Sequence, residues 1–229
     1  MEHTGKAAIA EFVATFALIV VGAGAVILHT NGQLDLTGVA LANGLVLAAM
    51  GSVTAHLSGA LANPAVAISL WVTGKLPTGR AGVLVGAQVA GAVAGAFLLR
   101  FLLPTPLFES GSGGIPALGD GIATGKGIVI EAVATFFLVF AVFGTVVDDR
   151  RPSPNTSGLT IGLVLAVDML AFFPYTGAAA NPARWFGPAL ATTDWSSWSV
   201  WIVGPIAGGI IASVLYWSVF LKREDPATP

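Results

Sequence analysis

The triplet Asn63-Pro64-Ala65 recurs as Asn181-Pro182-Ala183, and each copy opens an apolar stretch too short to cross a membrane, at 63–72 and 181–190. Proline is favourable in the first turn of a helix because its missing N–H would be unpaired there anyway. Asparagine just before it is a good N-cap, since its side-chain oxygen accepts a hydrogen bond from the first turn. A glycine-containing segment precedes each stretch and ends the helix before it. Both stretches are therefore predicted to be short helices that begin inside the protein.

Long apolar windows surround these two stretches. A helix that spans a bilayer needs about 20 mostly apolar residues at a rise of about 1.5 Å each. Six windows meet this requirement, at residues 7–28, 36–55, 81–103, 127–147, 159–173 and 200–221. The sequence thus predicts an all-α membrane protein with six transmembrane helices and two re-entrant half-helices.

The composition supports a membrane protein and excludes several other classes. Only 10% of the 229 residues are charged and 55% are hydrophobic, with a mean hydropathy of +0.84, whereas a soluble domain carries about 25% charged residues. A net charge of −2 gives no footprint for nucleic acid. The chain has no cysteine and three histidines far apart, and no nucleophile–base pair or phosphate loop is recognisable. We therefore expect no cofactor, no metal and no enzymatic activity.

The chain contains an internal repeat. The letters GLVLA at 44–48 recur at 162–166, in the same frame, shifted by 118 residues, that aligns the two Asn-Pro-Ala boxes. A shift of 120 aligns EFVATF at 11–16 with EAVATF at 131–136. Each half then holds three spans, and an odd number of spans inverts the second copy relative to the first. The inversion brings the two short helices in from opposite faces, so that their N-termini meet near the midplane.

Basic residues in the short loops predict the orientation of the chain. Lys and Arg are enriched in cytoplasmic loops of membrane proteins. If both termini share one side, seven basic residues lie there and two on the other, which places both termini in the cytoplasm. The seven are Lys6, Lys75, Arg80, Arg150, Arg151, Lys222 and Arg223, against Arg100 and Lys126.

With its two Asn-Pro-Ala boxes, Arg184 after the second box, and Glu11 and Glu131 in spans one and four, the chain resembles the major intrinsic protein family, the aquaporins and aquaglyceroporins. The resemblance covers nearly the whole sequence. It implies a passive channel for water and small uncharged solutes that excludes protons and ions, in a homotetramer in the plasma or inner membrane. It also implies a single channel domain over residues 1–229, with a first repeat at 1–110, a connecting loop at 111–125, a second repeat at 126–221 and a cytoplasmic tail at 222–229.

The two loops before the half-helices are expected to line the pore. Non-helical backbone at membrane depth survives only where it lines a water-filled path or is buried in protein. We expect the loop carbonyls to accept hydrogen bonds from the permeating molecule, and the amides of Asn63 and Asn181 to donate to it. Each half-helix N-terminus carries roughly half a positive charge, which repels cations and interrupts a proton wire. The carbonyls are those of Ala60, Leu61, Ala62, Ala178, Ala179 and Ala180.

Four charged residues lie where charge is costly. An arginine as deep as Arg184 requires carbonyls or water around its guanidinium, and we expect it both to hold the loop and to place a positive charge at a constriction. Glu11 and Glu131 lie in mid-span, and we expect them to accept hydrogen bonds from the backbone of the re-entrant loops rather than to act in catalysis. Asp168 has two open roles: it shapes the selection of solutes, or it pairs with loop N–H groups.

The resemblance places Asn43, Met169, Ala178 and Arg184 at the narrow filter of the family. Strict water channels carry an aromatic residue at the first of these positions and histidine at the second, whereas glycerol facilitators pair aromatic residues with a small one. This chain departs from both patterns. The loss of ring bulk predicts a wider mouth that admits glycerol, urea or undissociated metalloid acids as well as water.

Other subclass signals disagree, and alternatives stay open. Trp185 replaces an aspartate usual in glycerol-type members, while Ala189 resembles the water-selective type. The alternatives are a strict water channel, a secondary transporter with Asp168 as its one candidate ligand for a coupling ion, and a closed-pore structural member. The loop at 104–125 either covers the outer mouth or is disordered. Phe172, Phe173 or Tyr175 would narrow the opening by folding back over it.

Overall fold

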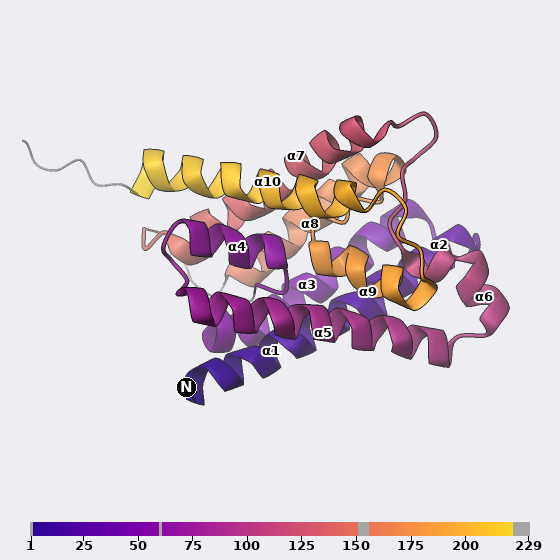
Figure 1. The fold of residues 1–229 in the computed structure, drawn as a ribbon, viewed down its shortest axis with the longest axis horizontal. Coiled ribbons are helices and arrows are strands. Elements are labelled where there is room, and N and C mark those ends of the chain that lie inside the picture. The colour runs from indigo at the N-terminus through magenta and orange to yellow at the C-terminus, as the bar shows by residue number, and fades with distance from the viewer. Residues whose placement is uncertain (1, 60, 151–155, 222–229) are drawn as a thin grey trace, which may run out of the picture.

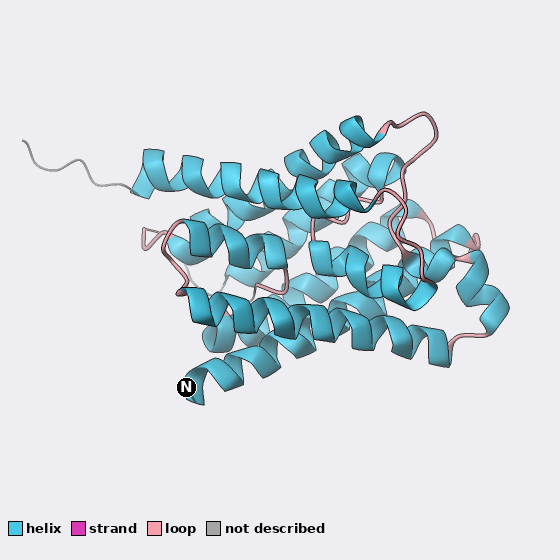
Figure 2. Ribbon diagram, in the orientation of Figure 1, coloured by secondary structure: helices cyan, strands magenta, loops and turns pink. Residues whose placement is uncertain are grey.

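The computed structural model describes residues 2–59, 61–150 and 156–221, and in these ranges it consists of helices joined by loops, without strands (Figure 2). The first span is one helical run made of α1 (Glu2–Leu18), the π-helical turn η1 (Ile19–Ala23) and α2 (Gly24–Thr30). The other elements are α3 (Leu36–Ser58), α4 (Pro64–Val72), α5 (Thr78–Leu102), α6 (Thr105–Ser110), η2 (Ser112–Gly114), α7 (Thr124–Val142), η3 (Phe143–Val147), α8 (Ser157–Thr176), α9 (Pro182–Thr192), α10 (Trp198–Tyr216) and η5 (Trp217–Leu221).

The predicted architecture of six spans and two half-helices is confirmed. Six helical runs of 20 to 27 residues are long and apolar enough to cross a membrane, and α4 and α9 occupy the two Asn-Pro-Ala stretches. Several spans run up to three residues beyond the predicted ends, and local caps fix where α3 and α8 start or stop. Asp35 accepts a hydrogen bond from Gly38 N at 2.7 Å and so starts α3, while Gly59 and Gly177 end α3 and α8 in the left-handed region, at φ of 97° and 76°. Glycine adopts this conformation without the steric cost of a Cβ.

The two half-helices lie along the middle of the molecule, between α5 and α10 (Figure 1). The spans around them pack in equivalent pairs: α1 on α5 in the first half, and α7 on α10 in the second. α3 and α8 pack against each other across the two halves. The start of α1 and the end of η5 lie at the same end of the molecule (Figure 1).

The contact between α3 and α8 depends on two glycines that the repeat places at equivalent positions. A Cβ built on Gly44 would lie 2.6 Å from the Gly162 carbonyl oxygen, and one built on Gly162 would overlap the Gly44 carbonyl oxygen. Small residues let the backbones of membrane helices approach closely. This close approach brings Asn43 and Met169, from the two spans, to the same side of the contact, where both line one cavity.

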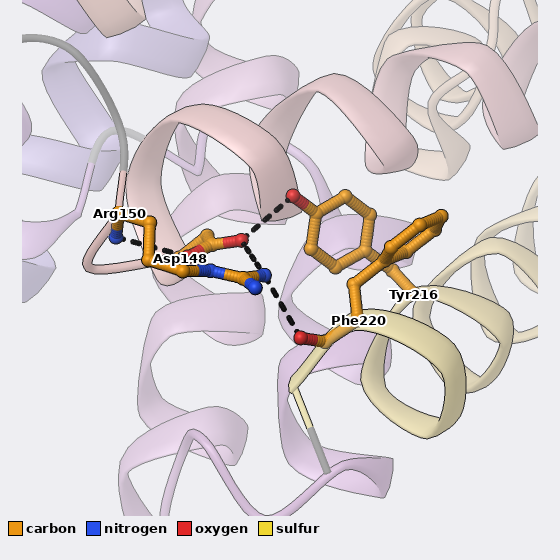
Figure 3. A network of polar contacts seen from close by, with 4 residues as sticks. All are labelled: Asp148, Arg150, Tyr216 and Phe220. Carbon is orange, nitrogen blue, oxygen red and sulfur yellow. Dashed lines mark hydrogen bonds and ion pairs between the residues drawn. The ribbon is translucent and has the colours of Figure 1, made fainter. Parts of the chain in front are cut away.

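Polar contacts tie the end of the sixth span to the loop after the fourth (Figure 3). Asp148 accepts hydrogen bonds from Arg150 Nη2 at 2.6 Å and from the Tyr216 hydroxyl at 3.0 Å. Arg150 Nη2 also donates to the Phe220 carbonyl oxygen at 2.8 Å. The Arg150 guanidinium and the Arg150 backbone N–H hold the pKa of the Asp148 carboxyl well below its usual range. We call these four residues the loop clamp.

The loop clamp predicts a pH dependence at the acidic end of the scale. A carboxyl whose pKa is lowered on folding contributes stability above its ordinary pKa of about 3.9, and this contribution is lost as the pH falls below that value. We expect Asp148→Asn to lower the melting temperature of the detergent-solubilised protein slightly at neutral pH, because Arg150 is largely exposed and such pairs are weak. The gap between wild type and variant should begin to close as the pH falls below about 4 and should go on closing toward the lowered pKa of Asp148. A gap that stays constant over this range would show that the charge of Asp148 stabilises nothing.

Candidate functional site

Each half-helix begins with the asparagine cap that the sequence predicts. Asn63 Oδ1 accepts a hydrogen bond from Ala65 N at 2.9 Å. Asn181 Oδ1 accepts hydrogen bonds from Ala183 N at 2.9 Å and Arg184 N at 3.3 Å. Pro64 and Pro182 follow in the first turn, where no N–H is needed. The caps direct both side chains toward the start of the opposite half-helix.

The two boxes hold each other through reciprocal hydrogen bonds. Asn63 Nδ2 donates to the Ala180 carbonyl oxygen at 2.7 Å, and Asn181 Nδ2 donates to the Ala62 carbonyl oxygen at 2.9 Å. The half-helices therefore meet tip to tip, as the inverted repeat predicts. These carbonyls bind the opposite box, a role that the sequence analysis did not foresee for them. Each amide nitrogen keeps a second N–H, and each carbonyl a second lone pair.

The loops before the boxes have an unusual backbone conformation. Ala62, Ala178 and Ala180 have positive φ values of 45°, 45° and 47°. Such residues cost on the order of 1–3 kcal/mol each and persist only where their surroundings hold them. Ala60, expected to supply a further carbonyl, lies outside the described residues.

Glu11 holds the first loop. Its carboxylate accepts hydrogen bonds from Leu61 N at 3.0 Å, Ala62 N at 2.6 Å, the Ser58 hydroxyl at 2.5 Å and Gln88 Nε2 at 2.6 Å. The side chain is fully buried. The expected contact with the loop backbone is present. Ser58 and Gln88 are partners that the sequence analysis missed, and for Gln88 nothing in the spacing links it to Glu11.

Glu131 holds the second loop in the equivalent way. Its carboxylate accepts hydrogen bonds from Ala179 N at 3.0 Å, Ala180 N at 2.7 Å and the Thr176 hydroxyl at 2.7 Å. Thr176 takes the place that Ser58 has in the first half, and the 118-residue shift that pairs these two positions was the signal that could have identified both.

A narrow cavity of about 10 Å³ lies where the half-helices meet. This volume is close to the minimum for a single water molecule, about 10–15 Å³. Asn43, Asn63, Met169, Asn181 and Arg184 contribute polar or polarisable groups to its lining. The remaining lining residues are mostly apolar: Leu18, Leu47, Leu61, Ala62, Val66, Leu138, Val142, Ile161, Leu165 and Ala179.

Arg184 is buried beside this cavity and only partly satisfied. Its Nη1 donates to the Gly114 carbonyl oxygen at 2.8 Å, while Nε and Nη2 have no hydrogen-bond partner within the described ranges. Gly114 belongs to the connecting loop, so this loop contacts a residue of the cavity wall. Arg184 thus holds a loop and lines the cavity, and two of its buried nitrogens have no partner in the described part of the chain.

Three of the four expected filter residues line the cavity, namely Asn43, Met169 and Arg184. Ala178 is fully buried, but it is not among the described residues that form the lining. The Asn43 amide is anchored to backbone, since Nδ2 donates to the Val39 carbonyl at 2.9 Å and to the Gly22 carbonyl at 3.4 Å.

Asp168 lies neither at the narrow cavity, where it would shape the selection of solutes, nor against the N–H groups of a described loop. It lines an apolar groove of about 670 Å³ between α7 and α8, not the narrow cavity. Its Oδ2 is buried and has no hydrogen-bond partner in the described part of the chain, so the pairing with loop N–H groups is absent. The reason is angular: one residue along a helix turns the side chain by about 100°, which carries Asp168 from the pore side, where Met169 lies, to the side facing α7.

The aromatic residues at the end of α8 do not narrow the cavity. The Phe173 ring packs edge-on against His29 with centroids 5.4 Å apart, and Tyr175 is exposed. Neither residue, nor Phe172, is among the described residues that line the narrow cavity.

Comparisons with known proteins agree with this geometry. The family described as "Major intrinsic protein" matches residues 2–216. Aquaporin TIP4-4 of Zea mays is 39% identical over 229 residues, which cover 95% of this chain and 88% of the relative. Aquaporin-4 of Mus musculus is 34% identical, over 96% of this chain and 70% of the relative. The X-ray structure of the aquaglyceroporin from Plasmodium falciparum superimposes with a TM-score of 0.83 at 26% identity, over 94% of this chain and 96% of that one.

The fold and the site define a multi-pass membrane protein with two re-entrant half-helices that meet at a narrow cavity. The chain belongs to the major intrinsic protein family, the aquaporin channels.

Proposed function

We propose that the protein is a passive channel that conducts water together with small neutral solutes such as glycerol and urea, and that excludes protons and other cations. The observation that carries this proposal is the composition of the cavity wall. Arg184 lines it and has two nitrogens without a partner among the described residues, and Asn43 and Met169 line it without aromatic or histidine bulk.

The arrangement supplies hydrogen bonds along an otherwise apolar path. The Arg184 Nε and Nη2 groups and the second N–H of Asn63 and Asn181 are donors for a passing oxygen atom. Leu61 and Ala179 line the same cavity, and their carbonyl oxygens are the acceptors in this proposal. The charge of Arg184 and the positive ends of two facing half-helices oppose the entry of cations.

A strict water channel is the second candidate, and the size of the cavity favours it. A volume of about 10 Å³ accommodates one water molecule, so a molecule as large as glycerol passes only if the wall moves. Met169 provides that movement in the first proposal, because an unbranched thioether side chain adapts its shape readily. The two candidates therefore differ in whether the Met169 side chain moves aside to let a larger solute pass.

Stopped-flow light scattering on proteoliposomes separates these candidates. We expect facilitated fluxes with water, glycerol and urea gradients, each well above that of protein-free vesicles. We also expect an activation energy near that of free diffusion, because no transport cycle is involved. Facilitation of water alone would establish the strict water channel, and a saturable, steeply temperature-dependent flux would indicate a secondary transporter.

A double substitution tests the assignment of the filter. Asn43→Phe with Met169→His restores ring bulk at both positions, and we expect it to suppress glycerol flux by about tenfold, equivalent to about 1.4 kcal/mol at the barrier, while water flux changes much less. Leu163→Phe serves as a control, since Leu163 lines the apolar groove between α7 and α8 and not the narrow cavity. Equal suppression of water and glycerol would contradict the filter assignment.

Assembly and placement form part of the same proposal. The chain acts as a homotetramer in a cell membrane, with both termini on the cytoplasmic side. The start of α1 and the end of η5 lie at the same end of the molecule (Figure 1). This arrangement supports the proposal that both termini are on one side of the membrane. Cross-linking of the purified protein would reveal the number of copies, and accessibility of tags added at either terminus would reveal the side.

A further inference from the structure

The first span has a π-helical turn next to the side chain of Asn43. The turn η1 covers Ile19–Ala23 and contains Gly22, which is buried. π-helical turns are rare and often occur at functional sites. Gly22 faces the side chain of Asn43: a Cβ built on Gly22 would overlap Asn43 Oδ1 and would stand 3.0 Å from Cγ and 3.5 Å from Nδ2.

The Asn43 amide therefore lies directly over the bare backbone of Gly22. Its Nδ2 donates to the Gly22 carbonyl oxygen at 3.4 Å and to the Val39 carbonyl oxygen at 2.9 Å. The residue is almost fully buried, although it lines the narrow cavity. The missing side chain of Gly22 thus forms a recess, and the amide occupies this recess instead of the lumen.

We propose that Gly22 is a positioning residue that sets the width of the pore beside Arg184, because it accepts the Asn43 amide against the first span. The inference rests on the proposed function, since it concerns the selectivity of the same cavity. A methyl group at position 22 cannot share the recess with the amide. The side chain of Asn43 must then rotate away from Gly22 toward the cavity that it already borders, and the cavity becomes narrower.

The test is the permeability of Gly22→Ala in proteoliposomes. We expect glycerol permeability to fall by about tenfold, which corresponds to about 1.4 kcal/mol at the barrier, and water permeability to fall by a smaller factor. Gly24→Ala is the matched control, because its methyl group would meet only Leu99 Cδ2, at an ordinary 3.4 Å. The Gly24→Ala variant should conduct glycerol and water as wild type does.

Removal of the displaced amide should reverse the effect. In Gly22→Ala with Asn43→Ala, no amide is left to enter the lumen, so both permeabilities should return to those of Asn43→Ala alone. A glycerol or water permeability that stays low in the double variant would overturn the proposal, because the defect would then come from damaged helix packing. A Gly22→Ala variant that conducts like wild type would overturn it as well.

The outcome is separable from that of the proposed function. If wild type conducts water but no glycerol, the solute proposal fails. The water permeabilities of Gly22→Ala, Asn43→Ala and the double variant still show whether the effect of Gly22→Ala requires the Asn43 amide. If wild type conducts both and positions 22 and 43 act independently, only the role of Gly22 fails. Melting temperatures near that of Gly24→Ala would establish that each variant is folded.

Discussion

Replacement of Glu131 by leucine is expected to prevent the chain from reaching a stable native fold. The carboxylate is the acceptor for two backbone N–H groups and the Thr176 hydroxyl, all buried. A buried donor without an acceptor costs about 1–3 kcal/mol. Three such losses together approach the whole stability of a typical protein, about 5–15 kcal/mol. The strained backbone at Ala178 and Ala180 would lose its anchor at the same time.

The measurement is the yield of monodisperse protein after detergent extraction, with its melting temperature. Glu131→Leu should give little or no folded protein, whereas Glu131→Gln, which keeps one acceptor oxygen, should lie between it and wild type. Glu109→Leu is the control, since Glu109 is exposed on α6. A Glu131→Leu protein as stable as the Glu109→Leu protein would show that the loop does not depend on this carboxylate.

The second large effect is expected at Arg184. Leucine at this position removes a full positive charge from the cavity wall. At a separation of about 8 Å and an effective dielectric constant of about 20, a unit charge changes the energy of a permeating cation by about 2 kcal/mol. The leak of protons or other cations should therefore rise by about 30-fold, while water continues to pass. Dye-loaded proteoliposomes under a pH gradient report the leak directly.

Arg184→Lys separates the two roles of the arginine. Lysine keeps the charge, so cation exclusion should persist, but it lacks the planar fork that reaches Gly114 while presenting other nitrogens to the cavity. We therefore expect a lower melting temperature with little leak. If Arg184→Lys leaks as much as Arg184→Leu, the geometry of the guanidinium and not its charge would be responsible for exclusion.

Much of the fold was predictable because membrane crossing imposes strict local rules. Span length and the Asn-Pro caps identified every span and both half-helices, and the repeat predicted that the boxes meet. The cost of a mid-span carboxylate drew attention to Glu11 and Glu131, whose carboxylates accept hydrogen bonds from the backbone of the two loops.

The features that were missed depend on packing between distant segments. The recess at Gly22 exists only because α3 lies against η1 at that height. The contact of Arg184 with Gly114 comes from a loop 70 residues away in sequence. The role of Asp168 stayed open because sequence spacing gives only its angle relative to Met169, and not which neighbouring helix occupies that direction.

The reciprocal contact of the boxes has a consequence for biogenesis. Asn63 and the carbonyl it binds are 117 residues apart, and Asn181 and its acceptor are 119 apart. The ribosome has therefore synthesised the first three spans well before it reaches Ala180, whose carbonyl oxygen binds Asn63. Until then, the tip of α4 must be hydrated or shielded by the insertion machinery, because lipid offers nothing to its amide. The conduit is thus completed only when the second half enters the bilayer and the two ends join.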